Sequence, residues 1–232
     1  MRLSVIIPAH NEQDNIEDVI NRVQQSIDVP YELIVVNDHS IDKTREIVAG
    51  SSAQYGNIRL VENKLAQGFA NTLKTGFSHS TGDVVVPIMA DLCDDLGTVK
   101  KMLSKIDEGY DIVCGSRYIR GGSRIGGSKA KGFFSSFVGR SLYYLLGLPT
   151  HDIANAFKMY RKKVIDSIDI ESCGFEVSME IPLKAYYLGF KITEVPTIWR
   201  ERAKGKSKFR IFKLSSSYIK LYIWAIFKSL TR

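Results

Sequence analysis

Acidic side chains follow three of the apolar runs in the sequence, where each run gives way to polar residues. The segments are residues 8–12 (PAHNE), 37–42 (NDHSID) and 89–95 (MADLCDD). One carboxylate in such a place can accept hydrogen bonds from a nucleobase or a ribose. Another can hold Mg²⁺ or Mn²⁺ on a diphosphate, because these cations prefer oxygen ligands. The residues therefore indicate a sugar-nucleotide site, with Asp38, Asp91 and Glu12 as the leading candidates.

The segment 86–95 (VPIMADLCDD) poses a question about the metal. An Asp-X-Asp metal pair would have its first carboxylate two residues before Asp91, and Met89 stands there. A ligand role for Asp91 is still favoured, because a carboxylate that ends a buried strand is costly without a partner. Asp38 has a second interpretation, since it could cap the following helix together with Ser40.

The hydrophobic pattern predicts strands that would bring these segments together. Residues 3–9 (LSVIIPA) and 32–38 (ELIVVND) are continuous apolar runs, typical of strands covered on both faces. Further strands are expected at residues 57–62, 83–91 and 110–116. Helical patterns separate the strands, with Asn11 as the N-cap of the first helix, which indicates an α/β fold with a mainly parallel, doubly wound sheet flanked by helices. Ligands of such sheets bind beyond the carboxyl ends of the strands, where the acidic segments lie.

The second half of the sequence has a different character. Residues 118–132 (YIRGGSRIGGSKAKG) are rich in glycine, serine and cations and are expected to form a mobile loop. An aromatic and aliphatic segment follows at residues 133–148 (FFSSFVGRSLYYLLGL). There is no internal repeat and no low-complexity linker, so one domain is expected. The predicted boundaries are residues 1–200 for that domain, 1–116 for its nucleotide-sugar-binding half, 117–200 for its acceptor-side half, and 201–232 for a basic amphipathic C-terminal tail.

Positive charge is concentrated near the C-terminus. The net charge of the chain is +7, and residues 199–232 carry ten Lys or Arg against the single acid Glu201. A basic tail on a nearly neutral body favours a polyanionic partner, which could be anionic lipid, a phosphate-bearing substrate or nucleic acid. A merely solvated basic surface would have the same composition. No nucleic-acid-binding module is recognisable, so a nucleic-acid partner is not expected.

The cysteines and the apolar segments bear on where the protein works. Cys93, Cys114 and Cys173 are scattered and odd in number, which indicates neither a disulfide framework nor structural zinc and favours a reducing compartment. The first residues read as a strand rather than a signal peptide. No window approaches the roughly 18 apolar residues of a membrane span. We therefore expect a cytoplasmic protein, peripheral on the cytoplasmic face of a membrane, and leave its oligomeric state open.

Several common activities lack their motifs in this sequence. No glycine-rich dinucleotide fingerprint and no phosphate-binding P-loop follows a predicted strand, which argues against a dehydrogenase or a kinase-like NTPase. The G-x-S-x-G elbow of α/β-hydrolases and the H-E-x-x-H zinc motif are absent as well. A nucleotidyltransferase would need a glycine-rich triphosphate loop with an activating lysine near the first strand, and the sequence has none.

Several segments, taken in order, resemble the family 2 glycosyltransferases of the GT-A fold. They are SVIIPAHNE, IVVNDHSIDKT, KLAQGFANTLKTG, MADL and GSRY. Within that family the chain is most similar to the dolichol-phosphate mannose synthases and related polyprenyl-phosphate glycosyltransferases. The resemblance continues through DIANAFKMYRKKV, GFEVSMEIPLKAYYLGFKITEVP and RERAKGKSKFRI, so it covers nearly the whole chain. Each motif alone is weak, but their order and spacing together are specific.

The resemblance implies roles for individual residues. Those that would line the nucleotide pocket are Pro8, Ala9, Asn11, Glu12, Asp38 and Gly68. Asp91 would bind the metal, Mg²⁺ or Mn²⁺. Those that would contact the acceptor phosphate or the diphosphate are Arg117, Lys131, Ser135, Arg202 and Lys208. Asp91, Arg117 and Arg202 would be catalytic, and guanidinium groups suit the task because they hold phosphate oxygens in a bidentate manner.

The sequence departs from the family pattern around the metal. Met89 stands where the family has the first aspartate of Asp-Ala-Asp, and Asn37 stands where it often has the first of two aspartates. Cys93 replaces a frequent polar residue, although Asp94 follows at once. Loss of one carboxylate could weaken metal binding, change the preferred metal, or leave more of the binding to the diphosphate. The resemblance therefore implies a metal site that still works but has a changed set of ligands.

The implied reaction is the inverting transfer of a hexose, mannose or glucose, from GDP-mannose or UDP-glucose to a polyprenyl phosphate. A phosphate monoester is already anionic near neutral pH, its second pKa being about 6, so the acceptor needs no general base. One alternative is transfer to a glycan hydroxyl, which needs a base, for which Asp152 and Glu180 are candidates. Another is a non-catalytic relative that binds sugar nucleotides and has lost its metal site.

The lipid would meet the aromatic segment at residues 133–148 and the tail segment at residues 217–230 (SYIKLYIWAIFKSL). Tyr222 and Trp224 lie there among aliphatic residues, a pattern suited to the headgroup region of an anionic membrane surface. An equally good interpretation is that this helix packs against the sheet or against a partner subunit.

Overall fold

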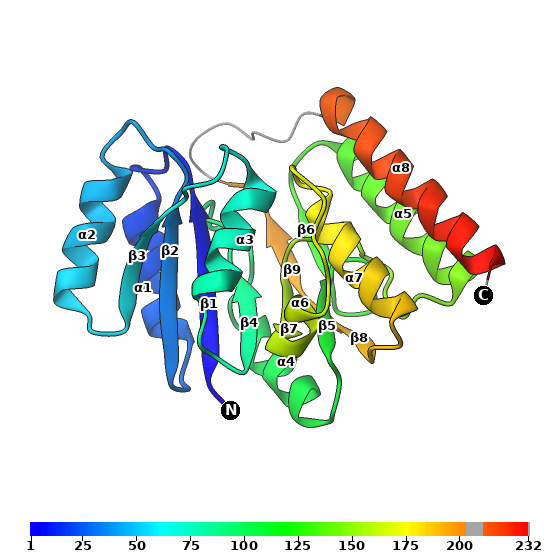
Figure 1. Ribbon diagram of the computed structural model, residues 1–232, viewed down its shortest axis with the longest axis horizontal. Coiled ribbons are helices and arrows are strands. Elements are labelled where there is room, and N and C mark those ends of the chain that lie inside the picture. Colours follow the sequence, from blue (N-terminus) through cyan, green and yellow to red (C-terminus); the bar gives the residue numbers. More distant parts are fainter. Residues whose placement is uncertain (203–210, 232) are drawn as a thin grey trace.

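The computed structural model describes residues 1–202 and 211–231, with side chains of the last helix described from residue 216 onward. Within these residues the centre is a seven-stranded sheet in the order β3-β2-β1-β4-β7-β5-β8 (Figure 1). Its strands are β1 (Leu3–Ala9), β2 (Tyr31–Asn37), β3 (Ile58–Glu62), β4 (Val84–Pro87), β5 (Ile112–Ser116), β7 (Lys158–Arg161) and β8 (Ile192–Pro196).

The neighbouring strands run parallel except at β7, which pairs antiparallel with β4 and with β5. The helices between them are α1 (Ile16–Ser26), α2 (Thr44–Gln54), α3 (Phe69–His79), α4 (Thr98–Asp107), α5 (Lys129–Leu146), α6 (Lys162–Asp166) and α7 (Val177–Tyr187), and α8 (Ile211–Leu230) ends the described chain. The predicted α/β fold with a mainly parallel, helix-flanked sheet and a C-terminal helix is confirmed.

Burial on both faces explains the continuous apolar strands. Val5 and Ile7 of β1 pack on the face covered by α1 and α4, whereas Ile6 between them packs on the face covered by α3 and α7. Figure 1 shows α3 and α7 in front of the sheet. Because successive side chains of a strand point to opposite faces, a strand covered twice needs apolar residues throughout.

A third apolar cluster lies outside the sheet and holds the C-terminal helix in place. Ala225 of α8 is buried against Val138 and Leu142 of α5 and Met179 and Leu183 of α7. In Figure 1, α8 runs alongside α5 at one side of the molecule. The helix therefore packs on other helices rather than on the sheet. Among the described helices, none combines the length and the apolar character that crossing a bilayer requires.

Three local features differ from the sequence predictions. β4 ends at Pro87, so the acidic segment 89–95 lies wholly in a loop. The predicted loop 118–132 contains β6 (Ser123–Ile125), which pairs in parallel with β9 (Ile198–Arg200). No local pattern marks β6, because its partner is remote in sequence. The N-cap of α1 is Asn15 rather than Asn11, which instead has a positive φ of 50°.

We expect Gly139→Ala to destabilise the protein. A Cβ at Gly139 of α5 would collide with the main-chain carbonyl of His151, which a flexible side chain cannot relieve. The free energy of unfolding should fall by about 1–3 kcal/mol, measured by urea denaturation. Gly50→Ala in α2 is the control: nothing lies within 4 Å of its Cβ position, so stability should stay equal or rise by up to about 1 kcal/mol. Equal stability of both variants would contradict the close contact of α5.

Candidate active site

The first two acidic segments are joined by hydrogen bonds between their loops. The side-chain oxygen of Asn11 accepts from the Ile41 N–H (2.9 Å), and the Asn11 N–H donates to the Ser40 hydroxyl (3.0 Å). The Glu12 N–H donates to the Thr44 hydroxyl (2.8 Å), at the start of α2. Asn11 tolerates the left-handed conformation that this turn requires. The loops after β1 and β2 therefore form one structure.

Asp38 is buried and organises the neighbouring loop. Its Oδ1 accepts from the side-chain amide of Asn63 (2.7 Å), and its Oδ2 accepts from the Gly68 N–H (3.1 Å). Gly68 begins α3 at a crowded point, where a Cβ would lie 2.9 Å from the main-chain oxygen of Cys173. Asp38 and Gly68, predicted separately, are thus in direct contact.

His10 lies over this loop pair and was not singled out from the sequence. Its Nδ1 lies 2.6 Å from the carbonyl oxygen of Asp38. A carbonyl oxygen can only accept, so the Nδ1–H of His10 donates this hydrogen bond. The side-chain amide of Gln67 lies 3.0 Å from the ring nitrogens of His10. The residues Pro8, Ala9, Asn11, Glu12, Asp38 and Gly68 occupy the ends of the neighbouring strands β1 and β2 and the start of α3. Their role in binding a nucleotide stays a prediction.

The loop after β4 carries a partly buried ion pair. Asp91 Oδ2 and Arg202 Nη2 are 2.8 Å apart, and the two side chains are 14% and 16% exposed. Strand β9, which ends two residues before Arg202, is tied to the same loop by a bond from the Arg200 N–H to the Cys93 carbonyl (2.9 Å). The sequence-remote tail is thereby held against the acidic loop.

Asp94 lies in the same loop and is more deeply buried than Asp91. Its Oδ2 has no hydrogen-bond partner. Burial and the negative charge of Asp91 raise the pKa of Asp94 to about 7, against the opposing effect of a hydrogen bond from the Met89 N–H. A buried carboxylate with an unused oxygen is costly unless a ligand or an ion completes it.

Arg117 is held by a fully buried carboxylate. Its Nε and Nη2 donate to the two oxygens of Asp152 (2.7 and 2.8 Å), its main-chain N–H donates to the same group (3.0 Å), and Nη2 also reaches the Ser135 hydroxyl (3.0 Å). Burial opposes the charge of Arg117, but the adjacent Asp152 outweighs burial and raises the pKa of the guanidinium. The side chain is 11% exposed and permanently cationic.

The N-terminal turn of α5 adds further positive potential. Ser128 caps the helix by accepting from the Lys131 N–H, and Ser128, Lys131 and Ser135 line one cavity. The N-terminus of a helix carries partial positive charge and unpaired N–H groups, and it therefore favours an anion.

This cavity has a volume of about 400 Å³ and collects the residues predicted for phosphate and metal. Asp91, Arg117, Lys131, Ser135 and Arg202 all line it, while Lys208 lies outside the described residues. Further residues line it that were not predicted: Asp94, Arg124, Phe134, Val138, Phe175, Trp199 and Tyr218. Asp94 had a signal in the sequence as a neighbour of Asp91, and Phe134, Val138 and Tyr218 belong to the two segments predicted to meet a lipid. Arg124, Phe175 and Trp199 had none, because they reach the cavity through contacts between segments that are remote in sequence.

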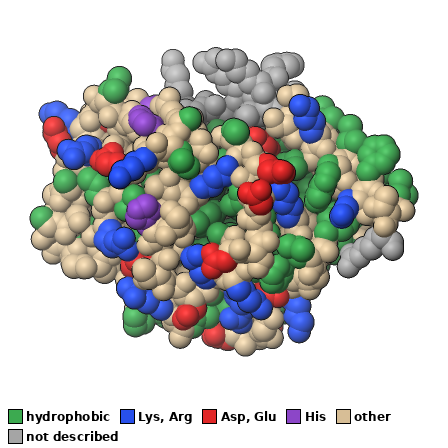
Figure 2. All heavy atoms as spheres, viewed as in Figure 1, with side chains coloured by type: hydrophobic (Ala, Val, Ile, Leu, Met, Phe, Trp, Pro, Cys, Tyr) green, Lys and Arg blue, Asp and Glu red, His purple; other side chains and the backbone are tan. Residues whose placement is uncertain are grey.

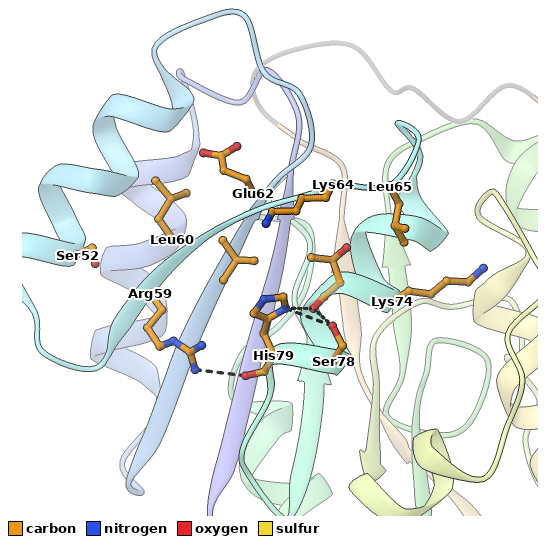
Figure 3. Close-up of a pocket in the computed structure, with 11 residues that line it drawn as sticks. Ser52, Arg59, Leu60, Glu62, Lys64, Leu65, Lys74, Ser78 and His79 are labelled. Atoms are coloured by element: carbon orange, nitrogen blue, oxygen red, sulfur yellow. Dashed lines mark hydrogen bonds between the residues drawn. The ribbon is translucent and has the colours of Figure 1, made fainter.

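A larger cavity of about 840 Å³ lies elsewhere, along β3 and α3 (Figure 3). Its lining includes Arg59, Lys64, Lys74 and His79, and its one carboxylate, Glu62, is paired with Arg45 (2.9 Å). We assign the active site to the smaller cavity, because only that one contains the acidic loop and the buried Arg117.

The cavity has the donor chemistry for a hard divalent cation. Within residues 1–202 and 211–231, no three His, Cys, Asp or Glu side chains are grouped so as to hold a metal by themselves. Asp91 and Asp94 nevertheless both line the cavity, and Asp94 offers an unpartnered oxygen. Mg²⁺ is commonly bound by one or two carboxylates together with substrate phosphates. These residues therefore fit a cation shared between the protein and a diphosphate.

Comparison with known proteins identifies the family of the chain. The sequence profile described as Glycosyl transferase family 2 matches residues 4–169. The dolichol-phosphate mannosyltransferase of Pyrococcus furiosus is 31% identical over an alignment of 234 positions, which covers 97% of this chain but only 64% of that longer protein.

Solved structures share the fold. Glucosyl-3-phosphoglycerate synthase from Mycobacterium tuberculosis, in complex with Mn²⁺, UDP and glucosyl-3-phosphoglycerate, has a TM-score of 0.75 at 22% identity and is matched over 97% of this chain and 80% of that chain. Its complex with Mg²⁺ and UDP has a TM-score of 0.73 at 21% identity, over 97% and 79% of the two chains. At such identities the likeness establishes the fold alone.

Breaking the buried ion pair should cost stability. Asp152→Asn leaves the charge of Arg117 buried with only neutral partners, so the free energy of unfolding should fall by about 3 kcal/mol or more, measured by urea denaturation. Asp28→Asn is the control, because Asp28 and its partner Lys100 are 67% and 80% exposed and such pairs contribute less than about 1 kcal/mol. A loss in Asp152→Asn no larger than in the control would show that the buried pair does not hold Arg117 in place.

Proposed function

The chain belongs to glycosyl transferase family 2, and we propose that it is a glycosyltransferase that moves a hexose from a nucleotide diphosphate sugar to a polyprenyl phosphate, with inversion. GDP-mannose is the first candidate donor and UDP-glucose the second. The relative from Pyrococcus furiosus, a dolichol-phosphate mannosyltransferase, supports mannose as the transferred sugar and a polyprenyl phosphate as the class of acceptor.

The composition of the cavity wall is the main observation that supports a polyprenyl phosphate as the acceptor. Arg117, Lys131 and Arg202 supply the cations that an anionic acceptor and a diphosphate need, while Phe134 and Val138 of α5 line the same cavity with apolar surface. An acceptor that joins a phosphate to a hydrocarbon chain matches both parts. A polar glycan would leave the apolar part of the wall without a partner.

The candidate bases for a hydroxyl acceptor are both engaged. Asp152 is fully buried and binds Arg117 with both oxygens. Glu180 is 1% exposed and accepts from the N–H groups of Glu171 and Ser172 (2.8 and 2.9 Å) and from Lys184 (2.7 Å). Burial acts to raise the pKa of Glu180, but the bonds from Lys184 and the main chain outweigh burial and lower it. An acceptor phosphate, already anionic, removes the need for a base.

In the proposed reaction, an acceptor phosphate oxygen forms a bond to the anomeric carbon as the bond from that carbon to the diphosphate breaks. The nucleoside diphosphate leaves with the electron pair, and no proton has to move. Arg117 and Lys131 would orient the acceptor phosphate, which lowers the barrier through positioning and charge complementarity. Asp91 and Asp94 would hold Mg²⁺ or Mn²⁺, which when bound offsets negative charge on the leaving diphosphate.

An apolar surface next to the cavity supports a membrane-bound acceptor. The exposed apolar side chains of α5 and α8 include Phe133 (75%), Phe137 (58%), Tyr144 (77%), Leu145 (64%), Phe227 (64%) and Leu230 (76%). Figure 2 shows hydrophobic side chains gathered at the right-hand edge, over the position of these helices. Such a surface marks an interaction site, and the exposed Lys220 and Lys228 of α8 suit anionic headgroups. A peripheral place on the cytoplasmic face of a membrane belongs to the proposal.

A small phosphorylated acceptor is the second candidate. The mycobacterial synthase has been solved with Mn²⁺, UDP-glucose and phosphoglyceric acid, at 21% identity to this chain. The cations of the cavity suit that class of acceptor equally well, but the apolar wall and the exposed faces of α5 and α8 do not favour it.

Lipid-linked product formation tests the proposed reaction. We expect the protein with GDP-mannose, a short polyprenyl phosphate and Mg²⁺ or Mn²⁺ to form a glycosyl-phospholipid, detected by mass spectrometry of the lipid phase. EDTA should abolish it, and Asp91→Asn should lower kcat/KM by at least about a hundredfold, since it weakens charge stabilisation at the diphosphate. UDP-glucose, UDP-N-acetylglucosamine and phosphoglyceric acid are tested in parallel.

Asp28→Asn, distant from the cavity wall, should keep the wild-type rate. Product from phosphoglyceric acid but not from the lipid phosphate would replace the proposed acceptor with the second candidate. Nucleotide binding without any transfer would indicate a non-catalytic relative.

Vesicle flotation tests the membrane surface. We expect the protein to float with vesicles of phosphatidylglycerol and phosphatidylcholine. The double variant Phe137→Ser/Phe227→Ser should bind at least about tenfold more weakly, because partial burial of each ring contributes on the order of 1 kcal/mol. Ile41→Ser is the matched control, since Ile41 is 93% exposed on the loop after β2. Equal flotation of both variants, or a wild-type protein that stays with the soluble fraction, would exclude this surface as the membrane contact.

A further inference from the structure

The metal site that the proposed function requires is short of one carboxylate. Asp91 lies on the cavity wall, but the side chain two residues before it is the thioether of Met89, which also lines the cavity. A thioether is a soft ligand and does not suit Mg²⁺ or Mn²⁺. With Asp91 alone, the protein would contribute a single carboxylate to a doubly charged ion.

The loop offers a second carboxylate at another position. Asp94 lies on the wall of the same cavity as Asp91 and Met89. It is 6% exposed, and its Oδ2 has no hydrogen-bond partner. The Asp94 carboxylate lies near the Met89 N–H, so the two positions are close in space.

Strand β9 explains why Asp94 points inward. The main chain at Asp94 forms an isolated bridge with Trp199, and the Arg200 N–H binds the carbonyl of Cys93. The next acid, Asp95, has a different role: its side chain accepts from the Gly97 N–H (3.2 Å) ahead of α4. Of the two adjacent acids, only Asp94 lines the cavity.

We propose that the carboxylate of Asp94 is the second protein ligand of the divalent cation, in place of a carboxylate at position 89. The inference rests on the proposed function, because the nucleotide diphosphate would complete the coordination. Arg202 holds Asp91 in the structure described here, so the cation must take over that carboxylate from the guanidinium. Cation and diphosphate should therefore bind together more tightly than the cation alone.

Direct Mn²⁺ binding, measured by electron paramagnetic resonance of the free ion, tests this assignment without any turnover. Titrations are made with and without GDP, and again with UDP. We expect the nucleotide to tighten Mn²⁺ binding to the wild-type protein. Asp94→Asn should weaken it by at least about tenfold, the order of effect that metal sites show when a supporting group is lost. Asp95→Asn is the matched control and should bind Mn²⁺ as the wild type does.

A rescue variant separates loss of a ligand from loss of the fold. In Met89→Asp/Asp94→Asn the number of carboxylates on the wall is restored, and we expect Mn²⁺ binding to recover most of the loss. Thermal melting of each variant checks that the domain is intact. Wild-type affinity in Asp94→Asn, or equal losses in Asp94→Asn and Asp95→Asn, would overturn the assignment.

The outcome is distinguishable from that of the transfer assay. If lipid product forms and Asp94→Asn binds Mn²⁺ as the wild type does, the proposed function stands and this inference is wrong. Mn²⁺ binding that depends on Asp94, without product from any acceptor, would do the reverse. Transfer that survives EDTA, with no Mn²⁺ bound in the presence of either nucleotide, would overturn the assignment and leave Arg202 as the cation at Asp91.

Discussion

A buried guanidinium requires a carboxylate within reach, and the pairing of Arg117 with Asp152 meets that requirement at the centre of the molecule. Both members are removed from water, and both oxygens of Asp152 are used. The pair joins the end of β5 to the segment before β7, and through Ser135 it also reaches α5. This part of the cavity wall is therefore assembled around one charge that cannot be neutralised by losing a proton.

The reversed direction of β7 makes this pairing possible. Because β7 runs antiparallel to β4 and β5, its first residue, Lys158, lies at the edge where those two strands end. The segment before it, with Asp152 and Asn155, is thereby delivered to the functional edge. Lys158 is itself fully buried and donates to the carbonyls of Ile153 and Asn155. An antiparallel insertion in a parallel sheet thus supplies a wall that consecutive parallel strands would not provide.

The parts of the fold that depend on local patterns could be predicted from the sequence. β1 and β2 are apolar throughout because both faces are covered, and the acids that follow them mark the functional edge. Family resemblance singled out Asp91, Arg117, Lys131, Ser135 and Arg202, and the structure brings these five residues to one cavity, while their roles stay predictions. What could not be predicted depends on remote contacts: β6 has no signal without β9, and the packing of α8 on α5 and α7 follows from its position rather than its composition. The sequence shows Asp94 close to Asp91, but it does not distinguish Asp94 from Asp95, because the difference between them lies in their burial.

The tether between β9 and the acidic loop has a consequence for what can separate Arg202 from Asp91. Arg202 follows β9 by two residues, and β9 is fastened to the loop at Cys93 and Asp94. The guanidinium can leave Asp91 only by the swing of its own side chain, so it stays within a short radius of the carboxylate. A ligand that carries both a cation and an anion, as a metal–diphosphate complex does, can exchange partners with both at once, and this favours it over either ion alone.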